Sequence, residues 1–228
     1  SYGFWKANSD SDDIVVFDES GQDEVCRLNM LRQQQDRGDS AYACLSDFVA
    51  PIETGLADHI GMFAVTSGLG ADELAREYEL DDDDYGSIMV GLLADRLAEA
   101  AAEWLHLKVR RDWGFADQGE FDLERLLKEE YRGIRPAFGY PACPDHSELE
   151  KTFGLLRAAE IGMELSESNA IIPSASVSGL YFAHPQSRYF SVGRVGKDQV
   201  NDYCERKKVN FVEAEGLLFG NLGYFGKD

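Results

Sequence analysis

Cysteines, prolines and basic residues are few in this 228-residue sequence, and long apolar runs are missing. The 4 cysteines lie too far apart for the short pairs of a zinc site and are too few for a secreted disulfide scaffold. No apolar run approaches the roughly 18 residues that a membrane-spanning helix needs. Residues 1–13 also lack the apolar core of a signal peptide. We therefore expect reduced thiols, no metal site and a cytoplasmic chain.

Positive charge is also scarce. Lys and Arg number 22 against 42 Asp and Glu, so the formal net charge is −20. A surface field of this sign repels nucleic-acid phosphates and anionic lipids, which argues against nucleic-acid and membrane partners. Hydrophobic residues make up 44% and aromatic residues 11%, which is typical of a folded chain and not of a disordered one. Without an internal repeat or a low-complexity linker, we expect one domain over residues 1–228.

Strands and helices are predicted in blocks along the chain. Strands come first, at residues 14–17, 25–31 and 59–66, and helices follow at 71–80, 85–110 and 122–131. A further helix is predicted over 147–161, then strands over 175–183 and 188–195, and finally helices over 197–207 and 211–218. Because strands and helices are segregated, this order predicts an α+β fold around a mostly antiparallel sheet.

The helix predicted over residues 85–110 is the longest. Its apolar residues recur at three- and four-residue steps, so we expect one face of the helix to lie in the core. These residues are Tyr85, Ile88, Met89, Leu92, Leu93, Leu97, Ala100, Ala101 and Trp104. The same helix carries Asp95, Glu99 and Glu103 at four-residue steps. This acidic stripe is either a solvated face or a surface for a cationic ligand.

Two short motifs imitate known sites. Ser67-Gly-Leu-Gly-Ala71 between a predicted strand and a helix resembles the start of a dinucleotide fingerprint, but Glu73 occupies the third glycine position and would face the phosphates. Glu103 and His106 have the Glu-x-x-His spacing of di-iron helical bundles, which require a second copy that this sequence lacks. Neither motif therefore predicts a nucleotide site or a metal site.

The loop Arg135-Pro-Ala-Phe-Gly-Tyr-Pro-Ala-Cys-Pro-Asp-His146 is the most informative stretch. Its prolines fix the backbone and remove amide donors, while Gly139 permits a close approach to the backbone. Such a stiff frame suits a preorganised binding surface. A proline-rich connection between two helices is the alternative that the residues alone leave open.

This loop closely resembles part of a known family. The loop and the later segments Ala175-Ser-Val-Ser-Gly-Leu-Tyr-Phe-Ala-His-Pro185, Ser187-Arg-Tyr-Phe-Ser-Val-Gly193 and Lys197-Asp-Gln-Val-Asn-Asp-Tyr203 resemble the C-terminal activation domain of cobalamin-dependent methionine synthase. Upstream segments agree, among them Trp5-Lys-Ala-Asn-Ser9, Cys44-Leu-Ser-Asp-Phe-Val-Ala-Pro51 and Ala94-Asp-Arg-Leu-Ala-Glu-Ala100. The likeness runs from end to end in order, which is far more specific than any single motif.

The resemblance implies an S-adenosylmethionine-binding domain of a methyltransferase, with a twisted, mostly antiparallel sheet and flanking helices. In that family cobalamin, held by another domain or chain, is occasionally oxidised to cob(II)alamin. The activation domain then supplies the methyl group of S-adenosylmethionine, while a flavodoxin-type or diflavin reductase provides an electron. The implied partners are therefore the cobalamin-binding domain of methionine synthase and such a reductase.

The resemblance also implies ligand contacts. Arg135 matches the guanidinium that holds the methionine carboxylate, a task suited to a planar and permanently charged group. Ala137, Gly139 and Tyr140 match loop positions whose backbone lies along the ligand.

Four further positions complete the implied site. Tyr189 and Phe190 match the segment that closes the other side of the ligand, and Glu99 and Glu129 match carboxylates near its polar groups. The match to Glu99 gives the acidic stripe a purpose, because acids hold a sulfonium cation better than bases do. The resemblance implies no catalytic residue and no metal ligand in this chain.

The sequence departs from the family in two places. Phe138 stands where family members usually have proline. The family's domain also begins well before the segment that matches Trp5-Lys-Ala-Asn, and its earlier portion carries an aspartate for the ligand's amino group. Because the sequence starts without Met and enters an apolar stretch at once, we expect a piece of a longer polypeptide that lacks this portion. The alternative function is then a non-catalytic module with an incomplete ligand cleft, which contacts a cobalamin-binding partner.

Overall fold

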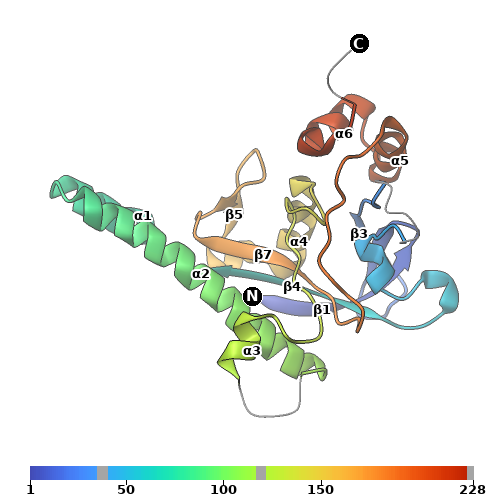
Figure 1. Ribbon diagram of the computed structural model, residues 1–228, viewed down its shortest axis with the longest axis horizontal. Coiled ribbons are helices and arrows are strands. Elements are labelled where there is room, and N and C mark those ends of the chain that lie inside the picture. The colour runs from blue at the N-terminus through green and yellow to red at the C-terminus, as the bar shows by residue number, and fades with distance from the viewer. Residues whose placement is uncertain (35–40, 117–121, 225–228) are drawn as a thin grey trace.

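A curled antiparallel sheet with helices packed on it forms the centre of the molecule (Figure 1). The structure is a computed structural model that describes residues 1–34, 41–116 and 122–224. The sheet has the strand order β3-β2-β1-β4-β7, and each neighbouring pair is antiparallel. Its strands are β1 (Tyr2–Asp10), β2 (Asp13–Phe17), β3 (Glu24–Asn29), β4 (His59–Thr66) and β7 (Ser176–Tyr181). The predicted α+β fold with a mostly antiparallel sheet and flanking helices is confirmed.

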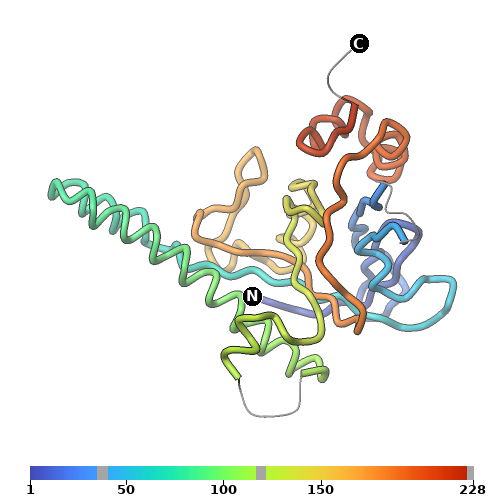
Figure 2. Tube along the Cα trace, in the orientation of Figure 1, coloured from blue at the N-terminus to red at the C-terminus, as the bar shows by residue number. Residues whose placement is uncertain are grey.

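Helices join the strands and extend from both ends of the sheet, as the chain trace shows (Figure 2). The α-helices of the described residues are α1 (Ala71–Leu80), α2 (Asp84–Trp113), α3 (Leu123–Leu127), α4 (Leu149–Leu156), α5 (Lys197–Lys207) and α6 (Phe211–Leu217). A small hairpin of β5 (Glu164–Leu165) and β6 (Ile171–Ile172) was not predicted. Helices α1 and α5 span the residues that the sequence predicted.

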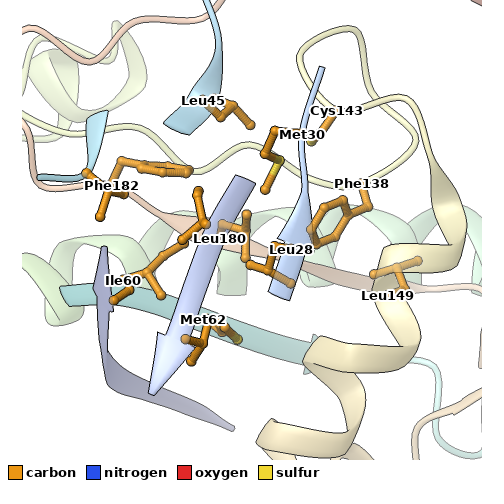
Figure 3. Close-up of a cluster of buried hydrophobic side chains, with 14 of the residues drawn as sticks. Leu28, Met30, Leu45, Ile60, Met62, Phe138, Cys143, Leu149, Leu180 and Phe182 are labelled. Carbon is orange, nitrogen blue, oxygen red and sulfur yellow. The ribbon is translucent and has the colours of Figure 1, made fainter. Parts of the chain in front are cut away.

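Strand β4 is buried on both faces, as its unbroken apolar run predicts. Ile60, Met62 and Ala64 belong to the main core, together with residues of α4 (Figure 3). Phe63 points to the opposite face of the sheet and packs with Leu105 of α2. Helices α4 and α2 therefore cover opposite faces of the sheet.

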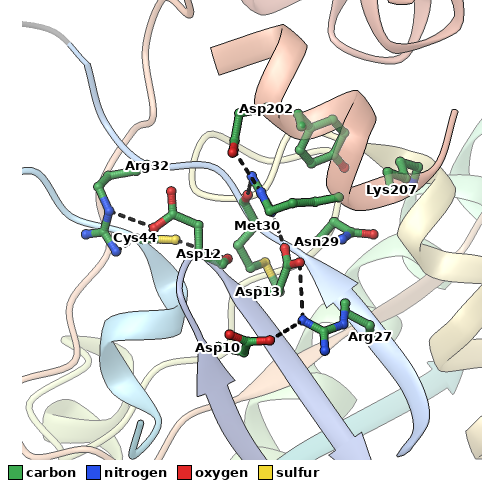
Figure 4. Close-up of polar contacts among 12 residues, drawn as sticks. Asp10, Asp12, Asp13, Arg27, Asn29, Met30, Arg32, Cys44, Asp202 and Lys207 are labelled. Carbon is green, nitrogen blue, oxygen red and sulfur yellow. Dashed lines mark hydrogen bonds and ion pairs between the residues drawn. The ribbon is translucent and has the colours of Figure 1, made fainter. Parts of the chain in front are cut away.

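Helix α5 lies over a cluster of buried charges at the far end of the sheet from α1 (Figure 1). Asp13, at the start of β2, pairs with Arg206 of α5 and lies 3.7 Å from a guanidinium nitrogen of Arg27 (Figure 4). Glu148 is fully buried and pairs with Lys151 at 2.8 Å and with Lys207. These ion pairs tie α5 to the sheet and to the start of α4.

The expectation that the apolar residues of the long helix lie in the core is wrong. Leu93, Leu97 and Trp104 are 55%, 61% and 62% exposed. The sheet meets another face of α2, lined by the small residues Ala94, Ala98 and Ala102 and then by Leu105 and Val109. Periodicity identifies residues that share a helical face, but it does not identify which surface covers that face.

The strand predicted over residues 188–195 is also wrong, since the described structure has no strand there. This segment runs beside the loop that contains Pro141, and a single backbone bond of 2.8 Å from the amide of Val192 to the carbonyl of Pro141 joins them. A loop that is rich in proline lacks the amide donors of a regular ladder.

Two predicted helices are shorter in the structure. The helix predicted over 122–131 ends at Leu127, and Glu129 adopts a left-handed backbone conformation with φ of 54°. The helix predicted over 147–161 ends at Leu156, because Arg157 has a left-handed φ of 51°. Short 3-10 turns at residues 146–148 and 158–161 flank what remains of it.

Candidate functional site

A cavity of about 670 Å³ lies where the loop after α3, strand β7 and the β5–β6 hairpin meet. Its volume falls within the range of small-molecule binding sites. Its walls come from segments that are far apart in the sequence. The lining residues are Glu99, Glu129, Arg135, Pro136, Ala137, Phe138, Tyr140, Pro141, Ala142, His146, Leu149, Asn169, Ala170, Ile171, Ser174, Ser176, Val177, Ser178, Tyr189 and Phe190.

The Arg135 loop is fixed to the free edge of β7. Ile134 and Phe182 exchange backbone hydrogen bonds of 3.2 and 3.1 Å, and the carbonyl of Pro136 accepts from the amide of Leu180 at 2.9 Å. Pro136 needs no amide here because its carbonyl makes the contact. A β-carbon at position 179 would lie 2.5 Å from the oxygen of Pro136, so only Gly179 allows the loop to approach the strand this closely.

Gly139 makes the sharp turn of the loop. Its φ of 86° is a left-handed conformation that favours glycine, and its amide donates to the carbonyl of Cys143 at 2.8 Å. A β-carbon at this position would lie 2.1 Å from the ring of His146. Gly139 itself does not line the cavity, whereas its neighbours Phe138 and Tyr140 do. Its position is therefore set by the turn and by His146.

Arg135 places a partly buried positive charge at the cavity wall. Its side chain and that of Glu103 are each 16% exposed and form an ion pair, while the hydroxyl of Tyr131 donates to Glu103 at 3.0 Å. The backbone amide of Arg135 donates to the hydroxyl of Tyr189 at 3.0 Å. Burial opposes the charge, but Glu103, Tyr131 and Tyr189 together outweigh it, so the pKa of Arg135 is raised. The Nε atom of Arg135 is buried and has no partner among the described residues, so the guanidinium keeps donor capacity.

An aromatic layer supports Arg135 from behind. The ring of His106 stacks on Tyr181 with centroids 4.9 Å apart and meets the ring of Tyr131 edge-on at 5.1 Å. The guanidinium carbon of Arg110 lies 3.7 Å from the centre of the Tyr131 ring. Burial, followed by the charges of Arg110 and Arg135, lowers the pKa of His106 to about 2. His106 is therefore a neutral packing residue of this layer.

Two acids face the same cavity as Arg135. Glu99 lies on an exposed part of α2, and Glu129 lies just after α3. The left-handed backbone of Glu129 follows the end of α3, as that of Arg157 follows the end of α4. One cationic group and two carboxylates around a single cavity suit a ligand that carries both signs of charge.

The remaining wall is largely apolar. Phe138 is 3% exposed and belongs to the main core, so its ring joins the cavity wall to the sheet. Phe190 packs against the same core, while Tyr140 and Tyr189 are more exposed. Aromatic rings and alanines around a polar corner are typical of sites that bind a heterocycle joined to a charged group.

The structure brings most of the predicted site residues together. Glu99, Glu129, Arg135, Ala137, Tyr140, Tyr189 and Phe190 all line the cavity, and Gly139 lies one residue behind the wall.

Sequence reasoning missed Glu103, which pairs with Arg135, and the wall of Ser174, Ser176 and Ser178. It also missed Asn169, whose left-handed φ of 61° lies in a Ser- and Asn-containing turn that was a readable hairpin signal. The serines reach the cavity only through the pairing of β7 with the sheet, for which the local sequence has no signal.

Comparison with known proteins identifies the family. The model of the family described as "Vitamin B12 dependent methionine synthase, activation domain" matches residues 1–208. This chain belongs to that family. A similar solved structure, with a TM-score of 0.95 and 49% sequence identity, is described as "Crystal Structure of the MetH Reactivation Domain bound to AdoHcy". The match covers 98% of this chain and 70% of that one.

Two further findings on this member of the activation-domain family concern membrane-spanning helices and a metal site. None of the described helices combines the length and apolar character needed to span a bilayer. Within residues 1–34, 41–116 and 122–224, no three His, Cys, Asp or Glu side chains are grouped so that they could hold a metal ion. Glu103 and His106 point to different partners, Arg135 and the aromatic layer, so their di-iron-like spacing has a structural explanation.

Proposed function

We propose that this chain binds S-adenosylmethionine in the 670 Å³ cavity and presents its methyl group for the reductive methylation of cob(II)alamin held by another domain or chain. The observation that carries the proposal is the partly buried Arg135, which pairs with Glu103 and lines one cavity together with Glu99 and Glu129. The ligand of the similar reactivation domain, AdoHcy, differs from S-adenosylmethionine by the transferred methyl group, which supports this assignment.

Arg135 is the residue that would bind the ligand's carboxylate. A guanidinium donates along two parallel directions and holds a carboxylate more tightly than a neutral donor does. Glu103 takes one terminal nitrogen, and the hydrogen bond from Tyr131 fixes Glu103 in turn. The pair therefore holds the guanidinium in one orientation at the wall before the ligand arrives. We assign Glu103 and Tyr131 as positioning residues.

Glu99 and Glu129 would face the cationic amine or sulfonium of the ligand. An opposite charge within a few ångströms favours the cationic form, and burial of the ligand strengthens this attraction. Phe138, Tyr189 and Phe190 provide the ring surfaces that an adenine can stack on. The hydroxyls of Ser176 and Ser178 on β7 donate to the carbonyls of Pro173 at 2.6 Å and Phe63 at 2.8 Å, so they would act toward a ribose as acceptors.

The sulfonium of S-adenosylmethionine would supply an activated methyl group to a cobalt centre reduced by one electron from a flavodoxin-type or diflavin reductase, and cleavage of the S–CH3 bond would leave S-adenosylhomocysteine in the cavity. This chain's own task is to bind and orient the donor, since no side chain of the cavity needs to accept or release a proton in a methyl transfer. The domain would then act as the donor-binding part of a methyltransferase, with the cobalamin-binding domain and the reductase as its partners.

The alternative is a non-catalytic module that contacts a cobalamin-binding partner. Calorimetric titration of the full chain with S-adenosylmethionine separates the two functions. Saturable, stoichiometric binding supports the proposal. If no heat above dilution is measured at about 1 mM ligand, binding is weaker than roughly −4 kcal/mol, and the non-catalytic module is the better account. Titration with methylthioadenosine, which lacks the amino-acid part, tests whether the polar corner contributes. It should bind more weakly.

A further inference from the structure

The aromatic layer behind Arg135 contains buried polar atoms that no described residue satisfies. His106 and Tyr181 are each 0% exposed. Both ring nitrogens of His106, the hydroxyl of Tyr181 and the Nε atom of Arg135 are buried and have no hydrogen-bond partner among the described residues. Buried donors and acceptors are costly to leave unpaired, and in folded proteins nearly all of them bind a protein group or an ordered water molecule. These atoms therefore require a partner.

The pairing of the Arg135 loop with β7 brings these atoms to one place. Ile134 and Phe182 exchange both backbone hydrogen bonds and form an antiparallel bridge. The next residues, Arg135 and Tyr181, are then directly opposite each other in a non-hydrogen-bonded pair, in which side chains on the same face lie closest together. His106 of α2 stacks on the ring of Tyr181, with centroids 4.9 Å apart. Arg135, Tyr181 and His106 are therefore neighbours.

The electrostatics of the layer agree with this arrangement. Burial, then the charges of Arg110 and Arg135, lower the pKa of His106 to about 2. Burial raises the pKa of Tyr181, and the charge of Arg135 is the first influence that opposes this rise. At physiological pH the ring of His106 is therefore neutral, with one nitrogen as a donor and the other as an acceptor, and Tyr181 keeps its proton.

We propose that one ordered water molecule is held between Arg135, Tyr181 and His106 and supports the guanidinium from behind. The water oxygen accepts from Nε of Arg135 and from the hydroxyl of Tyr181, and the water donates to the acceptor nitrogen of His106. Buried waters make about three hydrogen bonds of this kind to groups that lack a protein partner. The terminal nitrogens of Arg135 remain for Glu103 and for the ligand's carboxylate. His106 and Tyr181 are then positioning residues for Arg135.

A high-resolution crystal structure of the ligand-free chain tests the water directly. We expect density for one ordered water within about 3.2 Å of Nε of Arg135, of the Tyr181 hydroxyl and of one nitrogen of His106. A direct hydrogen bond between His106 and Arg135 at this position, or no density, would overturn the proposal. This test does not require a ligand, so it decides on the water even if S-adenosylmethionine does not bind and the proposed function fails.

The consequence for ligand binding rests on the proposed function. Tyr181→Phe keeps the ring stack but removes the hydroxyl, and His106→Phe keeps a ring but removes both nitrogens. In calorimetric titrations each should weaken S-adenosylmethionine by about three- to tenfold, the contribution of one hydrogen bond, and leave methylthioadenosine, which lacks the carboxylate, unchanged. Because both act through the same water, the double variant should lose no more than about the larger single loss. Tyr78→Phe on α1 is the matched control and should bind as the wild type does.

A further variant separates positioning from packing. His106→Gln retains an acceptor but not the ring, so it should recover part of the affinity that His106→Phe loses, which a packing role would not produce. Variants that bind both ligands as the wild type does would overturn the positioning role of His106 and Tyr181, and so would equal losses for both ligands. Melting temperatures identify any variant that does not fold, and the density for the water then decides.

Discussion

Two clusters of charged residues, one beneath α5 and one beside the cavity, use the same chemistry in different ways. In the α5 cluster Glu148 accepts from the amine of Lys151 at 2.8 Å, from Lys207 and from the backbone amide of Asn29 at 3.0 Å. Asp145 accepts from the hydroxyl of Tyr203 at 2.6 Å. Each buried carboxylate has several donors, so the cluster is closed.

The cluster beside the cavity is open. Arg135 pairs with Glu103, but its Nε has no partner among the described residues, and Glu99 and Glu129 line the cavity without an ion pair to another described residue. In a closed cluster the buried charges compensate one another, so removal of one partner is costly, whereas an open cluster retains interaction capacity for a ligand. Substitutions should therefore separate the two clusters cleanly, by stability in one and by affinity in the other.

The largest effect is expected in the closed cluster. Glu148→Gln should lower the free energy of unfolding by about 3–5 kcal/mol, because it removes one partner of a buried ion pair and leaves Lys207 less well compensated. Urea denaturation measures the change. Glu160→Gln, at an exposed position, is the control and should change stability by less than about 0.5 kcal/mol. A stability loss as small as the control's would mean that the α5 cluster is not closed.

In the open cluster, Arg135→Lys should reduce affinity while the melting temperature stays nearly constant. Lysine keeps the charge but loses the two parallel donors, so we expect a loss of about 1.5–3 kcal/mol in binding of S-adenosylmethionine. Calorimetry with the wild type and the variant gives the value, and Arg157→Lys on the surface is the matched control. Methylthioadenosine lacks the carboxylate, so its affinity should not change. An equal loss for that ligand would place Arg135 at another part of the site.

A smaller effect is expected at the turn of the loop that carries Arg135. Gly139→Ala should lower the free energy of unfolding by about 1–2 kcal/mol, because alanine resists a left-handed φ, and it should displace His146 from the cavity wall. Denaturation and calorimetry together measure the change in stability and in affinity. The double variant with His146→Ala removes the steric contact but not the backbone strain. If it recovers none of the lost affinity, His146 is not displaced as we expect.

The smallest effect concerns Glu99, which is exposed and therefore screened by solvent. Glu99→Gln should weaken binding of S-adenosylmethionine by about two- to fivefold, in line with the modest energy of exposed ion pairs. Binding of S-adenosylhomocysteine, which lacks the sulfonium charge, should barely change. Two dissociation constants for each protein provide the test. Equal losses for both ligands would indicate that Glu99 faces the amine, and no loss would return it to the solvated face.

Local signals predicted much of the fold. Helices 71–80 and 197–207 and strand 59–66 follow from local propensity and periodicity. Segment 188–195 has the composition of a strand, but a strand exists only if a neighbour can pair with it, and its neighbour is a proline-rich loop. The apolar stripe on α2 was assigned to the core because the sequence does not reveal that the sheet meets the alanine face instead.

The residues of the candidate site were predictable from the sequence only where they belong to a long motif that resembles the family. Arg135 and Tyr140 stand in one such motif, and the structure places both at the cavity. Glu103 was read as part of an acidic stripe or a metal motif, because its partner is 32 residues away in the sequence. Ser176 and Ser178 reach the cavity through sheet topology alone. The roles of Glu103, Ser176 and Ser178 therefore depend on contacts between residues far apart in the chain, which local sequence patterns do not predict.

His106 links the aromatic layer behind the cavity to the acidity of the solution. Its folded-state pKa of about 2 lies far below the ordinary value of 6.5, because burial and then Arg110 and Arg135 disfavour the charged ring. The unfolded chain takes up a proton at this residue below pH 6.5, whereas the folded chain does not. Stability is therefore fully present above that pH and falls by up to about 1.4 kcal/mol for each pH unit below it. Acid therefore destabilises the whole fold through the neutral ring of His106, which lies in the aromatic layer with Tyr131 and Tyr181.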